Sequence, residues 1–320
     1  MSQDAGAFGH RPVMVDEIVD LLGPVPAGVV LDGTVGGGGH ARAILEAHPH
    51  LSVLGIDRDA DALAAAAETL RPFGSRAQLY QARFDDFPAV ADRAGVSWLS
   101  AALFDLGVSS WQLDTPERGF SYRASGPLDM RMDAAGDAPT AADVVNTYDE
   151  ARLARLFADH GERRFARRIA RAIVRARPLH TTADLVEAVK VGIPAAARRT
   201  GGHPAKRVFQ ALRVEVNDEL EILPGTIDAA IGALAPGGRC IVLAYHSGED
   251  RLVKERFVAA VGGGCTCPHG LPCVCGSASR AVARFAVRGS RKPSPAEVAG
   301  NPRAESARLR AVEKLDRQGS

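Results

Sequence analysis

At 320 residues, the chain is long enough to bury one large domain, or one domain that carries an insertion. Its 46% hydrophobic and 24% charged content is that of an ordinary soluble globular protein. No apolar run reaches the length of a membrane span and the N-terminus lacks a signal-peptide pattern, so a cytoplasmic location is expected. Five cysteines, four of them clustered, do not form a secreted disulfide framework at this length.

The charge is distributed unevenly along the chain. Between Ala151 and Arg213 there are 15 Lys/Arg and 4 Asp/Glu, a net of +11 within a chain whose total is +1. The remainder therefore carries 24 basic and 34 acidic residues, a net of −10. A solvated arginine-rich helix is the ordinary explanation of such a run. The size of this excess favours instead a nucleic acid bound to the basic segment.

The first predicted strand, 29–31, ends in Asp32 and leads into a turn that contains five glycines and then a helix over 41–47. Such a turn lets backbone N–H groups approach a ligand closely. The next strand, 53–56, ends in Asp57, a carboxylate that suits the two hydroxyls of a ribose. Together these features predict an adenosine-containing cofactor at the carboxyl edge of a parallel sheet.

Two other interpretations of the glycine turn stay open. Gly36-x-Gly38-x-x-Ala41 matches the dinucleotide pattern, so NAD(P) is an alternative, and a surface loop without ligand is another. Asp32 lies just before the turn, where it suits the cationic amino-acid tail of S-adenosylmethionine, and no second catalytic half is evident. We therefore favour S-adenosylmethionine.

Strands and helices alternate through the first third of the chain. A helix over 60–70 and strands near 77–80 and 101–104 continue the pattern, which predicts a doubly wound parallel sheet. After Asp114 the chain becomes helical, and strands return at 239–245 and near 284–287. The predicted organisation is an α/β domain, 1–114 and 214–320, interrupted by a helical, arginine-rich insertion over 115–213.

The insertion contains a predicted helix with two distinct faces. Phe165, Ile169 and Ile173 form an apolar stripe at four-residue spacing. A second face carries arginines at spacing suited to successive phosphates: Arg164, Arg168, Arg171 and Arg175, with Arg167 nearby. The Pro- and Arg-rich segment 291–310 either returns to the α/β domain or contacts RNA.

Asp105 ends the fourth strand and precedes a tight turn, Leu106-Gly107. In a doubly wound sheet this strand end lies beside the cofactor. The exocyclic amine of a base has its lone pair delocalised into the ring, so attack on a methyl group requires acceptors that draw its protons. Asp105 is the candidate for that role, and the alternative is an acid that caps the next turn.

Longer motifs resemble a known family across nearly the whole chain. Residues 105–114 run Asp-Leu-Gly-Val-Ser-Ser-Trp-Gln-Leu-Asp and continue through Arg118-Gly119-Phe120-Ser121-Tyr122 to Pro127-Leu128-Asp129-Met130-Arg131-Met132. Further matching segments are His10-x-Pro12-Val13-Met14, 37–40, 55–59, 203–205, 209–214, His246-Ser247-x-Glu249-Asp250-Arg251 and 301–304. The chain resembles the bacterial ribosomal RNA small subunit methyltransferase H family, also called MraW.

This resemblance implies a class I S-adenosylmethionine-dependent methyltransferase that methylates N4 of a cytosine in the decoding region of 16S rRNA. The insertion would recognise the substrate, and Asp105 would be the catalytic residue. The implied cofactor-binding residues are Gly38, Gly39 and His40 at the methionine end, Asp57 at the ribose, Phe84 at the adenine, and Asp105 and Gln112. The implied partner is 16S rRNA in the small ribosomal subunit, without a membrane, and a homodimer is left open. A catalytically silent S-adenosylmethionine-binding assembly factor is the alternative function.

Several residues keep two interpretations. Tyr245 and Gly248 depart from the family pattern, which often has Phe and Leu there, and His246 is either a structural hydrogen-bonding residue or a base. Phe120 and Tyr122 either stack on a flipped cytosine or are buried aromatics. The cluster Cys265, Cys267, Cys273 and Cys275 either binds zinc or forms a reduced loop, and no metal ligand is assigned. Cys240 is expected in the core.

Overall fold

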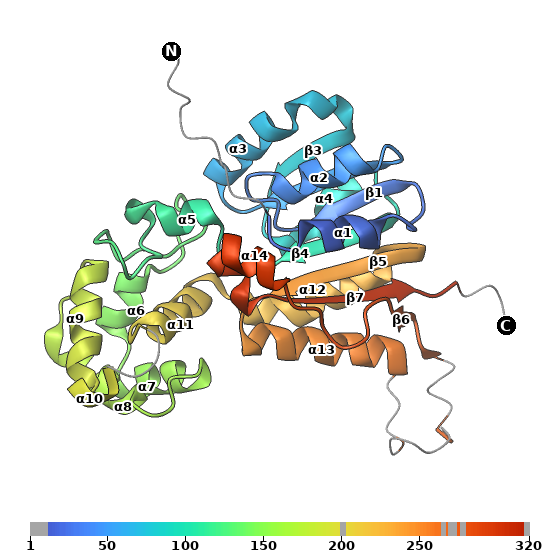
Figure 1. Cartoon of the computed structure of the whole chain (residues 1–320). Coiled ribbons are helices and arrows are strands. Elements are labelled where there is room, and N and C mark those ends of the chain that lie inside the picture. Colours follow the sequence, from blue (N-terminus) through green and yellow to red (C-terminus); the bar gives the residue numbers. More distant parts are fainter. Residues whose placement is uncertain (1–11, 199–202, 264–266, 268–273, 276–279, 317–320) are drawn as a thin grey trace, which may run out of the picture. The chain divides into compact units, whose positions relative to one another are not determined.

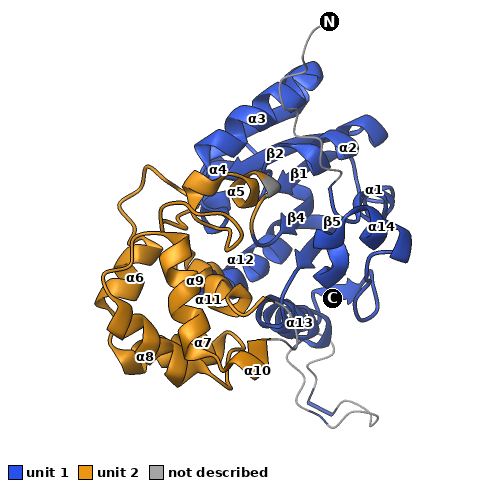
Figure 2. Ribbon diagram, turned by 60° about the vertical axis from the view of Figure 1, so that its left-hand side comes forward, with its two compact units in different colours: residues 1–107, 220–320 blue, residues 108–219 orange. Residues whose placement is uncertain are grey.

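The computed structural model describes residues 12–198, 203–263, 267, 274–275 and 280–316. The chain divides into two compact units, which Figure 2 colours separately. Unit 1 comprises residues 1–107 and 220–320, and unit 2 comprises residues 108–219. The roles expected for the two parts, cofactor binding and substrate recognition, stay predictions.

Unit 1 is built on a seven-stranded sheet in the order β3-β2-β1-β4-β5-β7-β6 (Figure 1). The first five strands in this order are parallel, and β7 is antiparallel to both of its neighbours. The expected doubly wound parallel sheet is thus confirmed, with an antiparallel addition at one edge. The strand bounds are β1 Gly28–Asp32, β2 Leu51–Asp57, β3 Ala77–Gln81, β4 Leu99–Asp105, β5 Leu234–Ala244, β6 Ala283–Phe285 and β7 Arg308–Lys314.

Helices cover both faces of this sheet, which explains why its central strands are almost uniformly apolar. On one face, α1 (Val15–Leu22), α2 (Gly39–Ala47) and α3 (Ala60–Leu70) pack on alternate strand residues such as Val30 and Leu103. On the other, α4 (Phe87–Arg93), α12 (Glu219–Ala233) and α13 (Ser247–Gly262) pack on the intervening residues, including Leu31 and Phe104. Cys240 is fully buried in this second core, as expected.

The C-terminal segment returns to the sheet. After β6 and the short α14 (Pro295–Gly300), β7 inserts between β5 and β6, with Ile241 opposite Ala311. Arg310 donates two hydrogen bonds to Asp250, at 2.7 and 3.1 Å. The sequence left open whether segment 291–310 contacts RNA or returns to the α/β domain, and it missed this final strand. The whole segment belongs to unit 1, and Arg291 at its start pairs with Leu309 of β7.

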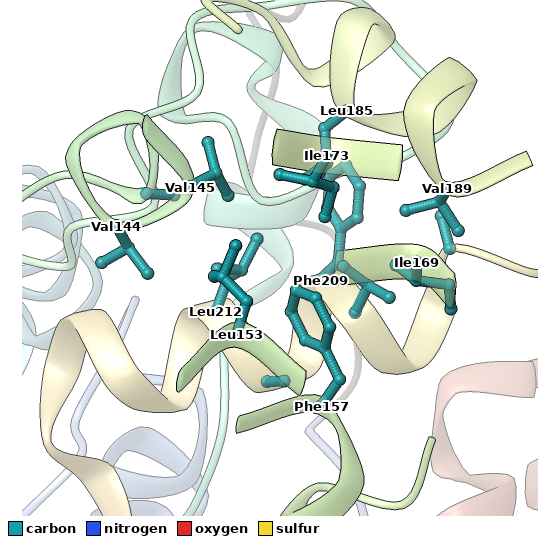
Figure 3. Packing of buried hydrophobic residues seen from close by; sticks show 14 of the residues in the cluster. Val144, Val145, Leu153, Phe157, Ile169, Ile173, Leu185, Val189, Phe209 and Leu212 are labelled. Atoms are coloured by element: carbon teal, nitrogen blue, oxygen red, sulfur yellow. The ribbon is translucent and has the colours of Figure 1, made fainter. Parts of the chain in front are cut away.

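Unit 2 is helical and has its own hydrophobic core. Phe157, Ile169, Ile173, Leu185 and Val189 are all fully buried there and converge in Figure 3. Threonine capping boxes fix the first residues of α6 and α9. The helices are α5 (Ser110–Asp114), α6 (Ala141–Thr147), α7 (Glu150–Asp159), α8 (Ala166–Ala176), α9 (Thr182–Gly192), α10 (Ala195–Arg198) and α11 (Lys206–Asn217).

The expected arginine ladder needs one correction. Helix α8 begins at Ala166 with Phe165 as its N-cap, so Arg164 lies before the helix. Its guanidinium stacks over the ring of Phe165, 4.9 Å from the centroid. Arg168, Arg171 and Arg175 do share the helix and are exposed.

The described residues contain neither a membrane-spanning helix nor a cluster of metal ligands. None of their helices combines the length and apolar character that crossing a bilayer requires. They contain no group of three or more metal-ligating side chains. Cys265 and Cys273, half of the cysteine cluster, lie outside the described residues.

Candidate cofactor and catalytic site

The glycine turn joins β1 to α2, in the predicted order of strand, turn and helix. Gly36 and Gly38 have left-handed backbones, with φ of +50° and +83°. A Cβ on Gly39 would lie 2.6 Å from Cγ of Pro12, so this glycine permits a close approach within the protein. A Cβ on Gly36 would meet no atom closer than 4.0 Å. Backbone conformation and packing therefore require glycine at these positions of the turn, and the space beside Gly36 is open.

Asp32, at the end of β1, is only 1% exposed. Its Oδ1 accepts a hydrogen bond from the Thr34 N–H at 3.3 Å, while Oδ2 has no partner in the described part of the chain. Burial raises the pKa of this carboxyl from 3.8 to about 7. A buried acceptor without a partner is costly, and a cationic ligand would relieve that cost. This atom fits the amino-acid tail of S-adenosylmethionine.

Asp57, at the end of β2, ties the two strand ends together. Its Oδ2 accepts a hydrogen bond from the Gly36 N–H at 2.9 Å, and its Oδ1 accepts one from the Asp59 N–H at 3.0 Å. Burial raises its pKa above the usual value, although these backbone bonds oppose the shift. Each carboxylate oxygen has two lone pairs, so acceptor capacity for ribose hydroxyls remains.

Phe84 contributes an apolar wall next to the end of β1. It begins the short 3₁₀ turn Phe84–Asp86, and its ring meets that of Phe104 edge to face, with centroids 6.0 Å apart. Gly33 lies against both: a Cβ there would be 2.5 Å from the Phe104 ring and 3.5 Å from Cβ of Phe84. A flat apolar group such as adenine is compatible with this surface.

Asp105 ends β4 and is held from three sides within unit 1. Its backbone N–H donates to Oγ1 of Thr34 at 2.7 Å, which links it to the turn after β1. The Tyr245 hydroxyl donates to Oδ1 at 2.7 Å. Nδ1 of His40 lies 3.7 Å from Oδ2, while Nε2 of His40 is bonded to the Val13 carbonyl at 2.9 Å. The Asp105 side chain is nevertheless 25% exposed, so it can meet a substrate.

The electrostatics of Asp105 suit a proton acceptor. Burial raises the pKa of its carboxyl, while His40 and the Tyr245 hydroxyl hold it down. Burial and the neighbouring Asp105 carboxylate raise the pKa of Tyr245 well above 10, so its hydroxyl stays a donor. A carboxylate with a raised pKa and one oxygen fixed by a hydrogen bond can orient an amino group and accept its proton.

His246 has a structural position as the N-cap of α13. Its Nδ1 accepts hydrogen bonds from the N–H groups of Gly248 and Glu249, at 3.2 and 3.3 Å. Its Nε2 lies 3.0 Å from the Glu249 carboxylate, which also accepts the Tyr245 N–H at 2.8 Å. The His246–Glu249 pair thus anchors the backbone beside Tyr245.

Three predicted site residues lie in unit 2. Gln112 is 4% exposed and completes a capping box with Ser109, whose N–H donates to the glutamine Oε1 at 3.0 Å. Phe120 is 5% exposed and lies in the unit 2 core, which agrees with the interpretation of this residue as a buried aromatic. Tyr122 stacks on His203, with ring centroids 4.4 Å apart. The cofactor role of Gln112 stays a prediction.

The structure therefore brings together Gly38, Gly39, His40, Asp57, Phe84 and Asp105 at the carboxyl ends of β1, β2 and β4. The sequence did not predict that Tyr245 contacts Asp105. The available signal was that Tyr245 carries a hydroxyl at a position where the family pattern often has Phe. Thr34 was also missed, and it has no distinguishing pattern.

Known proteins of one family match this chain over nearly its whole length. A model of the MraW methylase family matches residues 7–315. The "Ribosomal RNA small subunit methyltransferase H" of Acidothermus cellulolyticus is 53% identical over 315 residues, covering 97% of this chain and 94% of the relative. The protein of that name from Nocardioides sp. is 51% identical, covering 96% and 97%. That from Symbiobacterium thermophilum is 50% identical, covering 97% and 98%.

Proposed function

The chain belongs to the MraW methylase family, its cofactor is S-adenosylmethionine, and we propose that it methylates N4 of a cytosine in the decoding region of 16S rRNA. Relatives at about 50% identity over nearly the whole chain are named as methyltransferases of small-subunit rRNA, which supports the RNA substrate. The observation that carries the chemistry is the position of Asp105, which is partly exposed and is held by Tyr245.

The residues at the carboxyl edge fit this cofactor. When bound, S-adenosylmethionine supplies a methyl group already activated on a positively charged sulfur. Asp32 would pair with the ammonium group of the amino-acid tail, and the turn at Gly38-Gly39-His40 would enclose the methionine end. Asp57 would accept hydrogen bonds from the ribose hydroxyls, and Phe84 would lie against the adenine. Asp105 and Gln112 are the remaining proposed cofactor contacts.

Asp105 would act on the acceptor amine. The lone pair of a cytosine amino group is delocalised, so the nitrogen is a poor nucleophile until its N–H bonds are polarised. Oδ2 of Asp105 would accept one of these hydrogens while Oδ1 stays bonded to Tyr245, which fixes the direction of the free lone pairs. Positioning and charge placement are then the main contributions of the protein to the rate.

The proposal is tested with small ribosomal subunits from a strain that lacks this gene. The purified chain is incubated with methyl-labelled S-adenosylmethionine, and the rRNA is digested for mass spectrometry. We expect one N4-methylcytidine per subunit, within the decoding region. Binding of S-adenosylmethionine without any transfer would support a silent assembly factor, and methyl at another atom would refute the N4 assignment.

Substitution of Asp105 tests its role separately. Asp105→Ala should abolish transfer while the Kd for S-adenosylmethionine rises less than tenfold, because the other proposed cofactor contacts remain. Asp92→Ala, which removes an exposed acid of the same unit, is the matched control. Near wild-type transfer by Asp105→Ala would remove this residue from the mechanism.

A further inference from the structure

A groove runs along helices α8 and α9, wholly within unit 2, and encloses about 700 Å³. Ligand pockets of small molecules have this size, so the groove is large enough for one or two nucleotides. We call it the α8–α9 groove. Its lining includes Arg168, Arg171 and Arg175 on α8, and Ala183, Asp184 and Glu187 on α9.

Small residues create the groove. A Cβ on Gly192 would lie 2.6 Å from Cα of Ile169, so glycine lets the end of α9 approach α8 closely. The larger side chains of the pair, such as Ile173 and Leu185, turn into the unit 2 core (Figure 3). The outer surface keeps small side chains, with Ala176 and Ala183 exposed, and Val191 is 77% exposed. The floor is thus apolar and shallow enough to contact the flat face of a base or a ribose.

One rim of the groove is basic. Arg168, Arg171 and Arg175 are spaced three and four residues apart, which places them on one helix face over about 10 Å of its axis. Arg171 bonds to Glu150 of α7 at 3.2 Å. Arg168 and Arg175 make no ion pair with any residue that the structure describes. Their guanidinium donors are therefore uncommitted and suit phosphate oxygens.

The opposite rim presents two carboxylates. Asp184 accepts hydrogen bonds from the backbone N–H of Thr181 at 2.9 Å and of His180 at 3.1 Å, and these bonds lower its pKa. Glu187 is 70% exposed and contacts Lys190 at 2.7 Å. Carboxylates repel phosphates but accept hydrogen bonds from exocyclic amino groups, such as N4 of cytosine. In an RNA duplex these edges lie in a deep, narrow major groove that side chains cannot read, so the carboxylates would reach them in unpaired bases.

We propose that the α8–α9 groove binds a single-stranded segment of the RNA substrate, with phosphates on the arginine rim and bases over the alanine floor toward Asp184 and Glu187. This rests on the proposed function and deepens it, because it assigns a place on the chain to RNA outside the methyl-transfer site. Bases that carry an amino group are preferred over uracil. An acidic peptide is disfavoured, since its carboxylates would face those of Asp184 and Glu187.

The test compares two pairs of substitutions in the full-length chain. Arg168→Gln with Arg175→Gln removes two groove guanidiniums, and Arg155→Gln with Arg163→Gln removes the same charge from exposed positions outside the groove. Binding of fluorescent ten-nucleotide oligo-C, oligo-A and oligo-U is followed by anisotropy at several salt concentrations. Thermal unfolding confirms that each variant is folded.

We expect the groove variant to raise the Kd for oligo-C at least tenfold and to reduce the slope of log Kd against log salt by about 1.4, the value for two lost phosphate contacts on a single strand. The control pair should change the Kd at most about threefold. Glu187→Gln should lower the preference for oligo-C over oligo-U at least threefold. Equal effects of both arginine pairs, or an unchanged salt slope in the groove variant, would overturn the proposal.

Two further measurements separate this proposal from the proposed function. If the wild-type chain transfers no methyl group, but the groove substitutions weaken oligo-C binding and the control substitutions do not, the groove proposal stands and the proposed function fails. If the chain methylates small subunits and the groove variant keeps the wild-type KM, the groove proposal fails alone. If an oligoglutamate peptide binds the wild-type chain and the groove substitutions weaken that binding, while oligo-C binding does not depend on the groove, the groove would be assigned to an acidic protein.

Discussion

Replacing Tyr245 with phenylalanine isolates the hydroxyl that holds Asp105. The change removes one oxygen, whose hydrogen bond to the carboxylate spans 2.7 Å, and keeps the aromatic ring. A hydrogen bond to a charged group contributes about 1.5–3 kcal/mol. If that energy orients Asp105 in the transition state, kcat for methyl transfer should fall about tenfold to a hundredfold. The Kd for S-adenosylmethionine should change little.

The pH dependence gives a second measurement on the same variant. The Tyr245 hydroxyl holds the pKa of Asp105 down, so its removal should raise that pKa further. Transfer requires the ionised carboxylate, and the rate therefore rises with pH through the pKa of Asp105. The acid limb of the kcat profile should move to higher pH in Tyr245→Phe.

The assay is single-turnover methyl transfer to small subunits across pH 5 to 9. Tyr80→Phe is the control, because it removes a hydroxyl whose hydrogen bond to Gln78 is exposed and 3.3 Å long. A wild-type kcat together with an unmoved acid limb in Tyr245→Phe would show that Tyr245 does not position Asp105. A loss of kcat with an unmoved limb would instead indicate a packing effect.

Two other predictions concern stability. The pKa of Asp32 is about 7 in the fold against 3.8 in a free chain, so between these values the folded state binds more protons and stability falls as pH rises. Cofactor-free Asp32→Asn should therefore show a smaller fall in Tm than the wild type from pH 4 to 7, yet bind S-adenosylmethionine more weakly; parallel Tm curves would contradict this. Phe157→Ala removes a fully buried ring from the unit 2 core and should cost about 3–5 kcal/mol in denaturant unfolding. Phe285→Ala, at a ring 40% exposed, should cost far less, and equal costs would contradict the burial argument.

Local patterns in the sequence predicted the framework of unit 1. The predicted strand 29–31, glycine turn and helix 41–47 follow from residue types that are adjacent in the chain, and they correspond to β1, the β1–α2 turn and α2. Each acid at a strand end could be placed at one sheet edge because parallel strands end on the same side. Asp57 and Asp105 were predicted in this way.

Only the tertiary structure decided which side chains meet. Tyr245 and Asp105 are 140 residues apart, and their contact depends on β4 pairing with β5, which no local pattern specifies. The place of β7 between β5 and β6 depends likewise on long-range register. Periodicity put Arg164 on the predicted helix, but α8 begins at Ala166 with Phe165 as its N-cap, so Arg164 lies before the helix. Sequence thus determined the local elements and their charged ends, whereas the partners of those ends were fixed by packing between segments far apart in the chain.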